Sequence, residues 1–190
     1  MGFIYPGTCH PSSSWNITEK PNVQASWRIV TNNSAIKISD TLQKPIIQCL
    51  KSDIGDFIVK RADNLYAYQL VVVIDDFLQK VTEIVRGIDI YESTPRQVHL
   101  QQLLDYPTPT YLHLPVIVFP DGHKLSKQSH APAIDTSKPS QLLFQVFKML
   151  KMKPPEHIKT DNNQQCWEWA IQHWNPDRLK GIKAIICNSA

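Results

Sequence analysis

Glycine is scarce in this chain of 190 residues: there are 6 glycines against 14 prolines, which favours stiff turns over flexible linkers. The cysteines are also few and lie far apart, without a Cys-x-x-Cys pair, at Cys9, Cys49, Cys166 and Cys187. This scatter argues against a disulfide framework and predicts reduced thiols in a cytosolic protein.

The longest purely aliphatic run, residues 70–74, is too short to span a bilayer. The N-terminus has neither the basic segment nor the apolar run of a signal peptide. We therefore expect a cytoplasmic protein that is not inserted in a membrane.

The composition is otherwise ordinary for a globular domain. Apolar residues make up 42% of the chain, and a chain of this length buries well over half of its unfolded surface. The net charge of +3 permits a polyanionic partner but does not argue for one. One domain, or one domain with a short appendage, fits this length.

Strand-like patterns occupy the first two thirds of the chain, and helix-like patterns occupy the last third. Short strands are expected at residues 28–30, 57–59, 81–85 and 114–119. The apolar run at 66–74 fits either a strand buried on both faces or a buried helix. Together these patterns predict an α/β or α+β fold, in which a helix at 95–105 could serve as the crossover between parallel strands.

Two kinds of helix signal are present. Thr94, Pro95 and Gln97 form a typical start, with Thr94 as the cap, Pro95 in the first turn and Gln97 completing a capping box. Later helices are expected from Pro139 to about residue 150 and from about residue 161 to 174. In the last one, an apolar stripe at helical spacing predicts a buried face made of Trp167, Ala170, Ile171 and Trp174.

A turn at Asp121-Gly122 is followed by two lysines, Lys124 and Lys127, with the hydroxyl of Ser126 between them. Flexible ammonium groups on a loop suit a polyphosphate, because they can follow charge that moves during phosphoryl or nucleotidyl transfer. The same pattern also fits a solvated basic loop, since exposed lysines are common on protein surfaces.

A second set of residues suits an amino acid substrate. Arg86, at the end of a predicted strand, could hold a carboxylate with its guanidinium group, and the hydroxyl of Tyr68 on a neighbouring strand could bind an amino or carboxyl group. The alternative is a structural ion pair of Arg86 with Asp89 and a core tyrosine. His113 is expected to be a buried, hydrogen-bonded histidine, and the adjacent Asp75 and Asp76 are expected to diverge at a strand end.

Several segments together resemble the catalytic domain of the glutamyl-type class I aminoacyl-tRNA synthetases. The matching runs are GDFIVKRAD (residues 55–63), YAYQLVVV (66–73), VRGID (85–89) and STPRQ (93–97). Residues 124–128, KLSKQ, are similar to the second signature of this class, the KMSKS loop. The glutamine at its end and the following HAPA (130–133) point to the branch of glutamyl-Q tRNA(Asp) synthetases.

The resemblance implies a fold and an activity. The fold is the second half of a Rossmann-like catalytic domain followed by a small helical tail. The family activates glutamate with ATP and magnesium and transfers it to queuosine in the anticodon loop of tRNA(Asp). By position, Tyr68 and Arg86 match the glutamate-binding residues. The signature loop, with Lys124 and Lys127 as its lysines, matches the ATP-binding segment Lys124, Leu125, Ser126, Lys127 and Gln128. Tyr5 and Cys9 match the last two zinc ligands of a small arm.

The resemblance also implies what is missing. The family's first half carries a HIGH-like motif and a Cys-x-Cys pair, and this chain contains neither. We therefore expect a remnant of the zinc-binding arm at 1–27, a partial catalytic domain at 28–135 and a helical segment at 136–190, incomplete for catalysis without an N-terminal half. Two alternatives remain: a non-catalytic remnant, or a fragment of a glutamyl- or glutaminyl-tRNA synthetase. If the chain is incomplete, the strand run at 70–74 should leave an open sheet edge or an apolar patch exposed.

Overall fold

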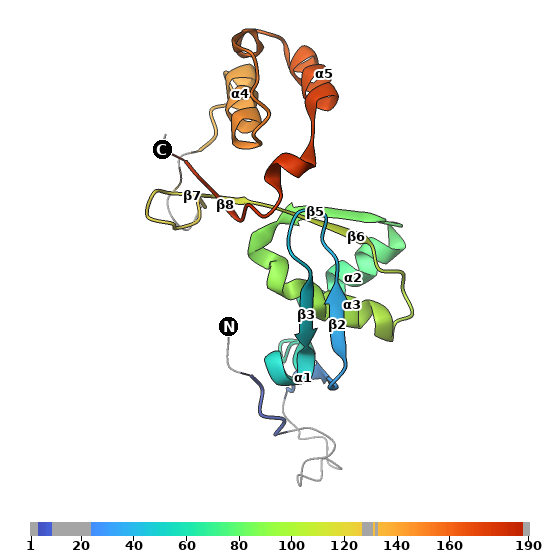
Figure 1. Cartoon of the computed structure of the whole chain (residues 1–190). Helices are drawn as coiled ribbons and strands as arrows, with labels where there is room; N and C mark the ends of the chain where they lie inside the picture. Colours follow the sequence, from blue (N-terminus) through green and yellow to red (C-terminus); the bar gives the residue numbers. More distant parts are fainter. Residues whose placement is uncertain (1–3, 9–23, 127–130, 132, 188–190) are drawn as a thin grey trace. The chain divides into compact units, whose positions relative to one another are not determined.

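The structure is a computed structural model that describes residues 4–8, 24–126, 131 and 133–187. The chain forms two compact units (Figure 1). The first comprises Met1–Asp40, Lys44–Ile84 and Ile90–Tyr111, and the second comprises Thr41–Gln43, Val85–Asp89 and Leu112–Ala190. Within the described ranges, no helix is both long and apolar enough to cross a membrane.

Paired strands in the first unit are short and antiparallel. Strand β1 (Trp27–Ile29) pairs with β4 (Phe57–Lys60), and β2 (Ala35–Ile38) pairs with β3 (Ile46–Cys49). In β2 the side chains alternate between exposed and buried, so Ile36 and Ile38 both point into the core, as a strand with one solvated face requires. The strands expected at 28–30 and 57–59 are confirmed.

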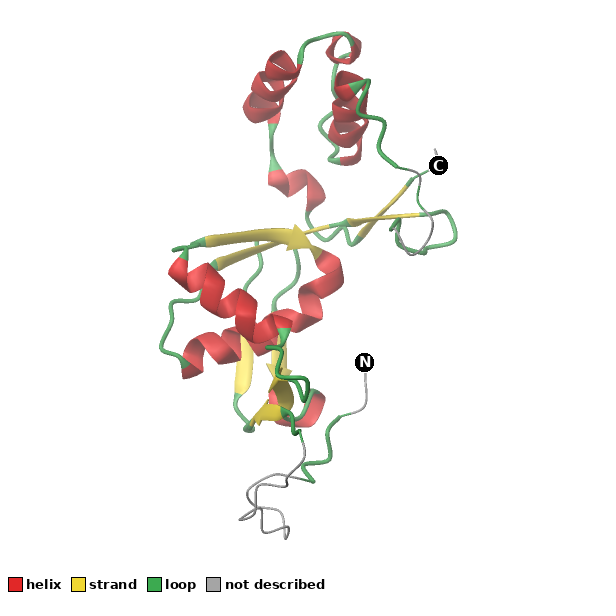
Figure 2. Cartoon of the chain, turned by 180° about the vertical axis from the view of Figure 1, so that it is seen from behind, coloured by secondary structure: helices red, strands yellow, loops and turns green. Residues whose placement is uncertain are grey.

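Three helices complete the first unit: α1 (Leu50–Asp53), α2 (Tyr68–Leu78) and α3 (Thr94–Leu103), the last preceded by the 3-10 helix η1 (Ile88–Ser93). Helices α2 and α3 lie side by side, as both views show (Figures 1 and 2). The core of this unit lies between these helices and the strands and contains Ile36, Ile38, Leu50, Phe57, Val59, Val73, Val98, Leu100 and Tyr111.

The ambiguous run at 66–74 is helical from Tyr68 onward, and Tyr66 forms an antiparallel bridge with Lys60. Eleven residues without glycine or proline, Tyr68–Leu78, form α2 and bury Val73, whereas a strand would be half that length. Asp75 and Asp76 therefore lie on a helix and not at a strand end, and successive residues on a helix point about 100° apart. The prediction of a strand-end turn there is wrong.

The start of helix α3 differs by one residue from the expected one. Helix α3 already includes Thr94 and follows η1 directly, and Ser93, the residue at the cap position, makes no capping hydrogen bond with its side chain. The amide nitrogen of the buried Gln97 donates instead to Gln69 Oε1 at 2.8 Å. The helix thus joins α2 through a side-chain hydrogen bond that local sequence rules do not describe.

Proline divides the strand that was expected at 114–119. Strands β6 (Thr110–Leu114) and β7 (Val116–Val118) flank Pro115, which has no N–H for a strand ladder. Strand β5 (Glu83–Gly87) pairs with β6. Strand β7 pairs in parallel with β8 (Ala184–Ile186), and the long connection that a parallel pair needs contains the C-terminal helices.

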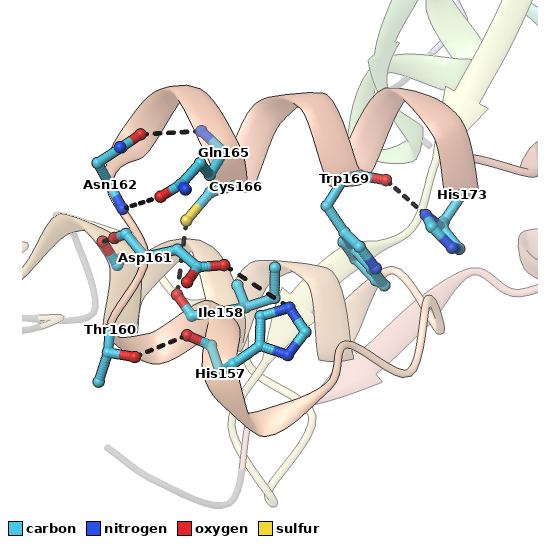
Figure 3. Close-up of polar contacts among 10 residues, drawn as sticks. His157, Ile158, Thr160, Asp161, Asn162, Gln165, Cys166, Trp169 and His173 are labelled. Carbon is cyan, nitrogen blue, oxygen red and sulfur yellow. Dashed lines mark hydrogen bonds and ion pairs between the residues drawn. The ribbon is translucent and has the colours of Figure 1, made fainter.

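The second unit contains the helices α4 (Pro139–Met149) and α5 (Asn163–His173), with 3-10 turns at η3 (Glu156–Lys159) and η4 (Pro176–Leu179). Figure 3 shows how α5 begins: the Asn162 side chain accepts from the Gln165 backbone, and the Gln165 side chain accepts from the Asn162 N–H. The buried Cys166 Sγ lies 3.5 Å from the Ile158 carbonyl oxygen. Both predicted helices are confirmed.

The buried face of α5 differs from the predicted one. Cys166 and Ala170 are buried against α4, together with Phe144 and Phe147. Of the predicted stripe, Trp167, Ile171 and Trp174 are exposed, with Ile171 76% exposed. The prediction of a buried side chain is therefore confirmed for Ala170 alone. The buried face of α5 is narrower than the apolar stripe in its sequence.

Candidate functional site

Arg86 lies in β5, and its guanidinium group is held by a histidine. Arg86 Nε donates to His113 Nε2 at 2.9 Å, and His113, on β6, is fully buried. Because Nε2 accepts this bond, the imidazole proton is on Nδ1. The prediction of a buried, hydrogen-bonded His113 is confirmed, and its partner is the arginine that the sequence analysis singled out.

Lys124 lies at the end of a tight hairpin. The Gly122 backbone has a φ of +86°, a conformation that glycine adopts without strain. Val118 and Lys124 form an antiparallel bridge, and the Leu125 N–H donates to the Ile117 carbonyl at 2.9 Å. The predicted Asp121-Gly122 turn is confirmed. Leu125 and Ser126 are half-buried, and Lys127 and Gln128 lie outside the described residues.

An acidic side chain connects the two predicted sites. Lys124 Nζ lies 2.6 Å from Asp89 Oδ2. The pKa of Asp89 is lowered, above all by the hydrogen bond from Lys124; burial opposes this shift, and the charges of Lys124 and Arg86 add to it. The structure therefore places Lys124 against Asp89, and the charge of Arg86, three residues earlier in the chain, also acts on this carboxylate. The sequence suggests Asp89 as a partner for Arg86 but does not indicate its contact with Lys124.

Gly87 makes the approach of Asp89 possible. A Cβ atom placed on Gly87 would lie 2.4 Å from Asp89 Oδ1 and 3.7 Å from Val116 Cγ1. Real Cβ atoms do not come so close to an oxygen, so any side chain at this position would displace the carboxylate from its present place. The glycine in the VRGID run thus has a local steric role beside the ion pair of Asp89 and Lys124.

Tyr68 opens helix α2 in the first unit and is 57% exposed. The prediction that it lies on a strand beside Arg86 is wrong in its secondary structure, because Tyr68 is the first residue of a helix. Tyr68 belongs to the first unit and Arg86 to the second. Their joint role as a glutamate pair remains a prediction.

The zinc prediction rests on Tyr5 and Cys9, and Cys9 lies outside the described residues. The Arg28 guanidinium carbon lies 3.9 Å from the centre of the Tyr5 ring, a cation–π contact. Among the described residues, no group of three or more histidine, cysteine, aspartate or glutamate side chains could hold a metal ion. Structural zinc needs four ligands, so the described residues do not fit a complete zinc site.

Helix α2 also borders a cavity of about 180 Å³ in the first unit, near its C-terminal end. Phe77 and Tyr106 both line it, and their rings stack at 3.7 Å with an interplanar angle of 5°. The buried Gln101 also lines the cavity, and its Oε1 accepts no hydrogen bond. The cavity contains none of the predicted site residues.

The profile of the family described as "tRNA synthetases class I (E and Q), catalytic domain" matches residues 17–159. The chain belongs to this family. The resemblance inferred from the sequence motifs is thereby confirmed, and with it the assignment to the aminoacyl-tRNA synthetase type of ligase.

Similar proteins agree on the branch of this synthetase family. The chain is 47% identical over 179 residues to a protein of Neisseria meningitidis serogroup B named glutamyl-Q tRNA(Asp) synthetase, covering 94% of this chain and 59% of that protein. A protein of the same name from Pseudomonas syringae pv. syringae is 40% identical, covering 96% and 60%. The chain thus spans about three fifths of the length of these relatives.

Solved structures support the α/β fold of a class I catalytic domain. A glutamate-tRNA synthetase from Elizabethkingia anophelis superimposes with a TM-score of 0.62 at 18% identity, covering 83% of this chain and 36% of that structure. A glutamate tRNA ligase from Elizabethkingia meningosepticum gives a TM-score of 0.60 at 19% identity, covering 80% and 34%. At such low identity this likeness concerns the fold alone.

Proposed function

We propose that this chain takes part in the ATP-dependent activation of glutamate and its transfer to queuosine in the anticodon loop of tRNA(Asp), in the cytoplasm. The observation that carries the proposal is the 40–47% identity to glutamyl-Q tRNA(Asp) synthetases over more than nine tenths of the chain. Because the chain spans three fifths of their length, it supplies part of the site, and the remainder comes from the region it does not match.

Arg86 is the proposed anchor for the substrate carboxylate. A guanidinium group presents N–H donors in a fork that matches a carboxylate, and the bond from Arg86 Nε to the buried His113 fixes the plane of that fork. Tyr68 is the proposed second contact, through its hydroxyl. His113 acts as a positioning residue, because it contacts Arg86 rather than the substrate.

The segment from Lys124 to Gln128 is the proposed ATP site, with magnesium on the polyphosphate and Lys124 and Lys127 as the catalytic lysines. Lys124 is half-exposed and bonded to Asp89. A polyphosphate that approaches Lys124 would compete with this carboxylate, so Asp89 holds the ammonium group in place until ATP binds. We assign no step to zinc, since the described residues do not form a site for it.

The proposal is tested by ATP–pyrophosphate exchange in the presence of glutamate. The chain alone should show no glutamate-dependent exchange. The chain together with the unmatched region of the N. meningitidis relative should show it, and Arg86→Ala should raise the KM for glutamate and so lower the exchange rate at subsaturating glutamate. Exchange by the chain alone, or an active mixture in which Arg86→Ala is as active as the wild type, would contradict the proposal.

A non-catalytic binding module is the second candidate, favoured by the partial coverage of the relatives. The two candidates differ in one measurement. If the chain binds tRNA(Asp) but the mixture never supports glutamate-dependent exchange, the binding module is the better description. Arg86→Ala should then leave tRNA binding unchanged, because its proposed ligand is the amino acid.

A further inference from the structure

Two large aromatic side chains are exposed on one face of the first unit, with a lysine between them. Trp27 on β1 is 68% exposed, and Tyr66, just before α2, is 61% exposed. Lys60 on β4 pairs with Trp27 on one side and with Tyr66 on the other, antiparallel in both cases. Residues directly opposite each other project to the same side of a sheet. We call Trp27, Lys60 and Tyr66 the aromatic row.

The ammonium group of Lys60 contacts both rings of the aromatic row. Its Nζ atom lies 5.6 Å from the centre of the Trp27 ring and 5.4 Å from the centre of the Tyr66 ring, within the range of a cation–π contact. Such contacts are weak at exposed positions, so an anionic ligand can compete with the rings for this ammonium group. The row thus presents two flat apolar surfaces and one positive charge to solvent.

The core of the first unit uses the other side of β4. Phe57 and Val59 alternate with Lys60 along this strand, and both are buried in the core. The outward rings therefore have no part in the packing of that core. Neighbouring exposed aromatic side chains, in contrast to scattered single ones, mark an interaction surface.

The charges around the aromatic row favour an anionic partner. Arg61 follows Lys60 directly and forms an ion pair of 2.7 Å with Asp63. Asp56, at the other end of β4, is buried and accepts two hydrogen bonds from Thr31. The carboxylates of this segment therefore already have partners, and Lys60 adds a positive charge beside the two rings.

An unpaired nucleotide matches both features of the row. Its base can stack on an aromatic ring, and its phosphate can bind an ammonium group. Bases in RNA loops are available for such stacking, whereas bases in a duplex stack on each other. The row also adjoins the proposed glutamate contact: Tyr66 and Tyr68 are both exposed, and residues two apart in a chain have Cα atoms at most about 7 Å apart.

We propose that the aromatic row binds an unpaired nucleotide of the acceptor RNA, with the base against the exposed rings and the phosphate on Lys60. The inference rests on the proposed function, which makes the anticodon loop of tRNA(Asp) the acceptor. The row would hold this loop on the first unit, next to the tyrosine proposed to bind the glutamate that is transferred.

The test measures binding of the full chain to a fluorescent RNA hairpin with the anticodon stem and loop of tRNA(Asp), by anisotropy. Trp27→Ala and Tyr66→Ala should each weaken binding at least about fivefold, as expected for the loss of one stacking contact. Trp27→Phe should retain most of the affinity, because it keeps a ring. Trp167→Ala is the matched control, since Trp167 on α5 is 54% exposed, and it should bind like the wild type.

The lysine is tested through the salt dependence of binding. Lys60→Met should weaken hairpin binding and flatten its dependence on salt concentration, because one phosphate contact is lost. Lys37→Met, at an exposed position of β2, should leave both the affinity and the salt dependence unchanged. An RNA duplex without a loop should bind the wild type and Trp27→Ala equally.

The outcomes separate the aromatic row from the proposed function. Wild-type affinity of Trp27→Ala and Tyr66→Ala for the hairpin, or no hairpin binding by the wild type, overturns the row. An equal loss of affinity for hairpin and duplex also overturns it, as does self-association of the chain that both variants abolish. Weaker hairpin binding in these variants, together with a mixture that shows no glutamate-dependent exchange, supports the row and refutes the proposed function. Circular dichroism melts check that the variants are folded.

Discussion

At the scale of single residues, His99 makes the stability of the first unit depend on pH. It lies in α3, is 7% exposed and has a lowered pKa, because burial disfavours the charged imidazole. Below pH 6.5 the unfolded chain binds a proton that the folded chain resists, so the free energy of unfolding falls as the solution is acidified. Urea unfolding at pH 7.5 and 5.5 should show this loss, and His99→Gln should reduce it.

The control for this prediction is His123→Gln, which changes a histidine on an exposed turn. It should lose as much stability on acidification as the wild type does. If His99→Gln and the wild type lose the same amount between the two pH values, burial of His99 does not contribute to the pH dependence.

The second prediction for a single residue concerns Gly87. Gly87→Ala places a Cβ atom against Asp89 Oδ1, so the carboxylate should move away from Lys124 and its pKa should rise towards the ordinary value of 3.8. The contact stabilises the folded chain above that pH and is lost as the pH falls through the lowered pKa. NMR titration of the Asp89 carboxyl carbon measures the change.

Two lysine variants accompany this experiment, one as a second test and one as a control. Lys124→Met should also raise the pKa of Asp89, because the hydrogen bond from Lys124 is the largest cause of its lowering. Lys180→Met removes a different exposed ion pair, with Asp177, and should leave the titration unchanged. An unaltered midpoint in Gly87→Ala would mean that Asp89 keeps its place despite the added methyl group.

At the scale of elements, the capping box of α5 allows a quantitative prediction. Asn162→Ala removes the side-chain acceptor for the Gln165 N–H and should cost about 1 kcal/mol of stability. Asn162→Ser keeps an oxygen at this position and should cost less. Urea unfolding measures both differences, and equal stability of the alanine and serine variants would contradict the capping role.

Elements could be predicted where local chemistry decides them. Pro139 and Gly122 mark a helix start and a turn because proline and glycine restrict or permit backbone angles whatever surrounds them. The run at 70–74 could not be assigned, since a continuous apolar stretch has the same appearance in a buried strand and a buried helix. Likewise, the contact of Gln97 with Gln69 joins two helices, and no local rule for a capping box describes it.

The candidate site also combines residues that the sequence predicts with contacts that only the tertiary structure reveals. His113 and Lys124 could be singled out from residue type and position, but their partners Arg86 and Asp89 are 27 and 35 residues away along the chain. The exposure of Trp167 was not predictable either. An apolar stripe marks a helix face that can be buried, and the tertiary structure decides whether a partner covers it.

At the scale of the whole molecule, each unit has a core of its own. Phe147 is buried in the second unit against Cys166 and Ala170. Phe147→Ala should lower the free energy of unfolding by about 3–5 kcal/mol. The loss of stability should be confined to the second unit. Hydrogen exchange should show lost protection in α4 and α5, with protection in α2 and α3 retained.

The reciprocal variant is Val73→Ala in the first unit, where Val73 is buried in the other core. It should reduce protection in α2 and α3 and leave α4 and α5 protected. If either variant lowers protection uniformly across both units, the two cores unfold as one cooperative structure, and the division into separately stabilised units is wrong.

Three residues from the first quarter of the chain belong to the second unit, and this has a consequence for the order of folding. Leu42 packs with Leu112 and Leu179, and the Gln43 amide donates to the carbonyls of His113 and Ile182. These contacts close loops of 70 and 139 residues, and long loops form late because their closure costs chain entropy. On the ribosome, residues 41–43 must therefore wait for residue 182 to emerge, while β2 and β3 on either side of them can already pair.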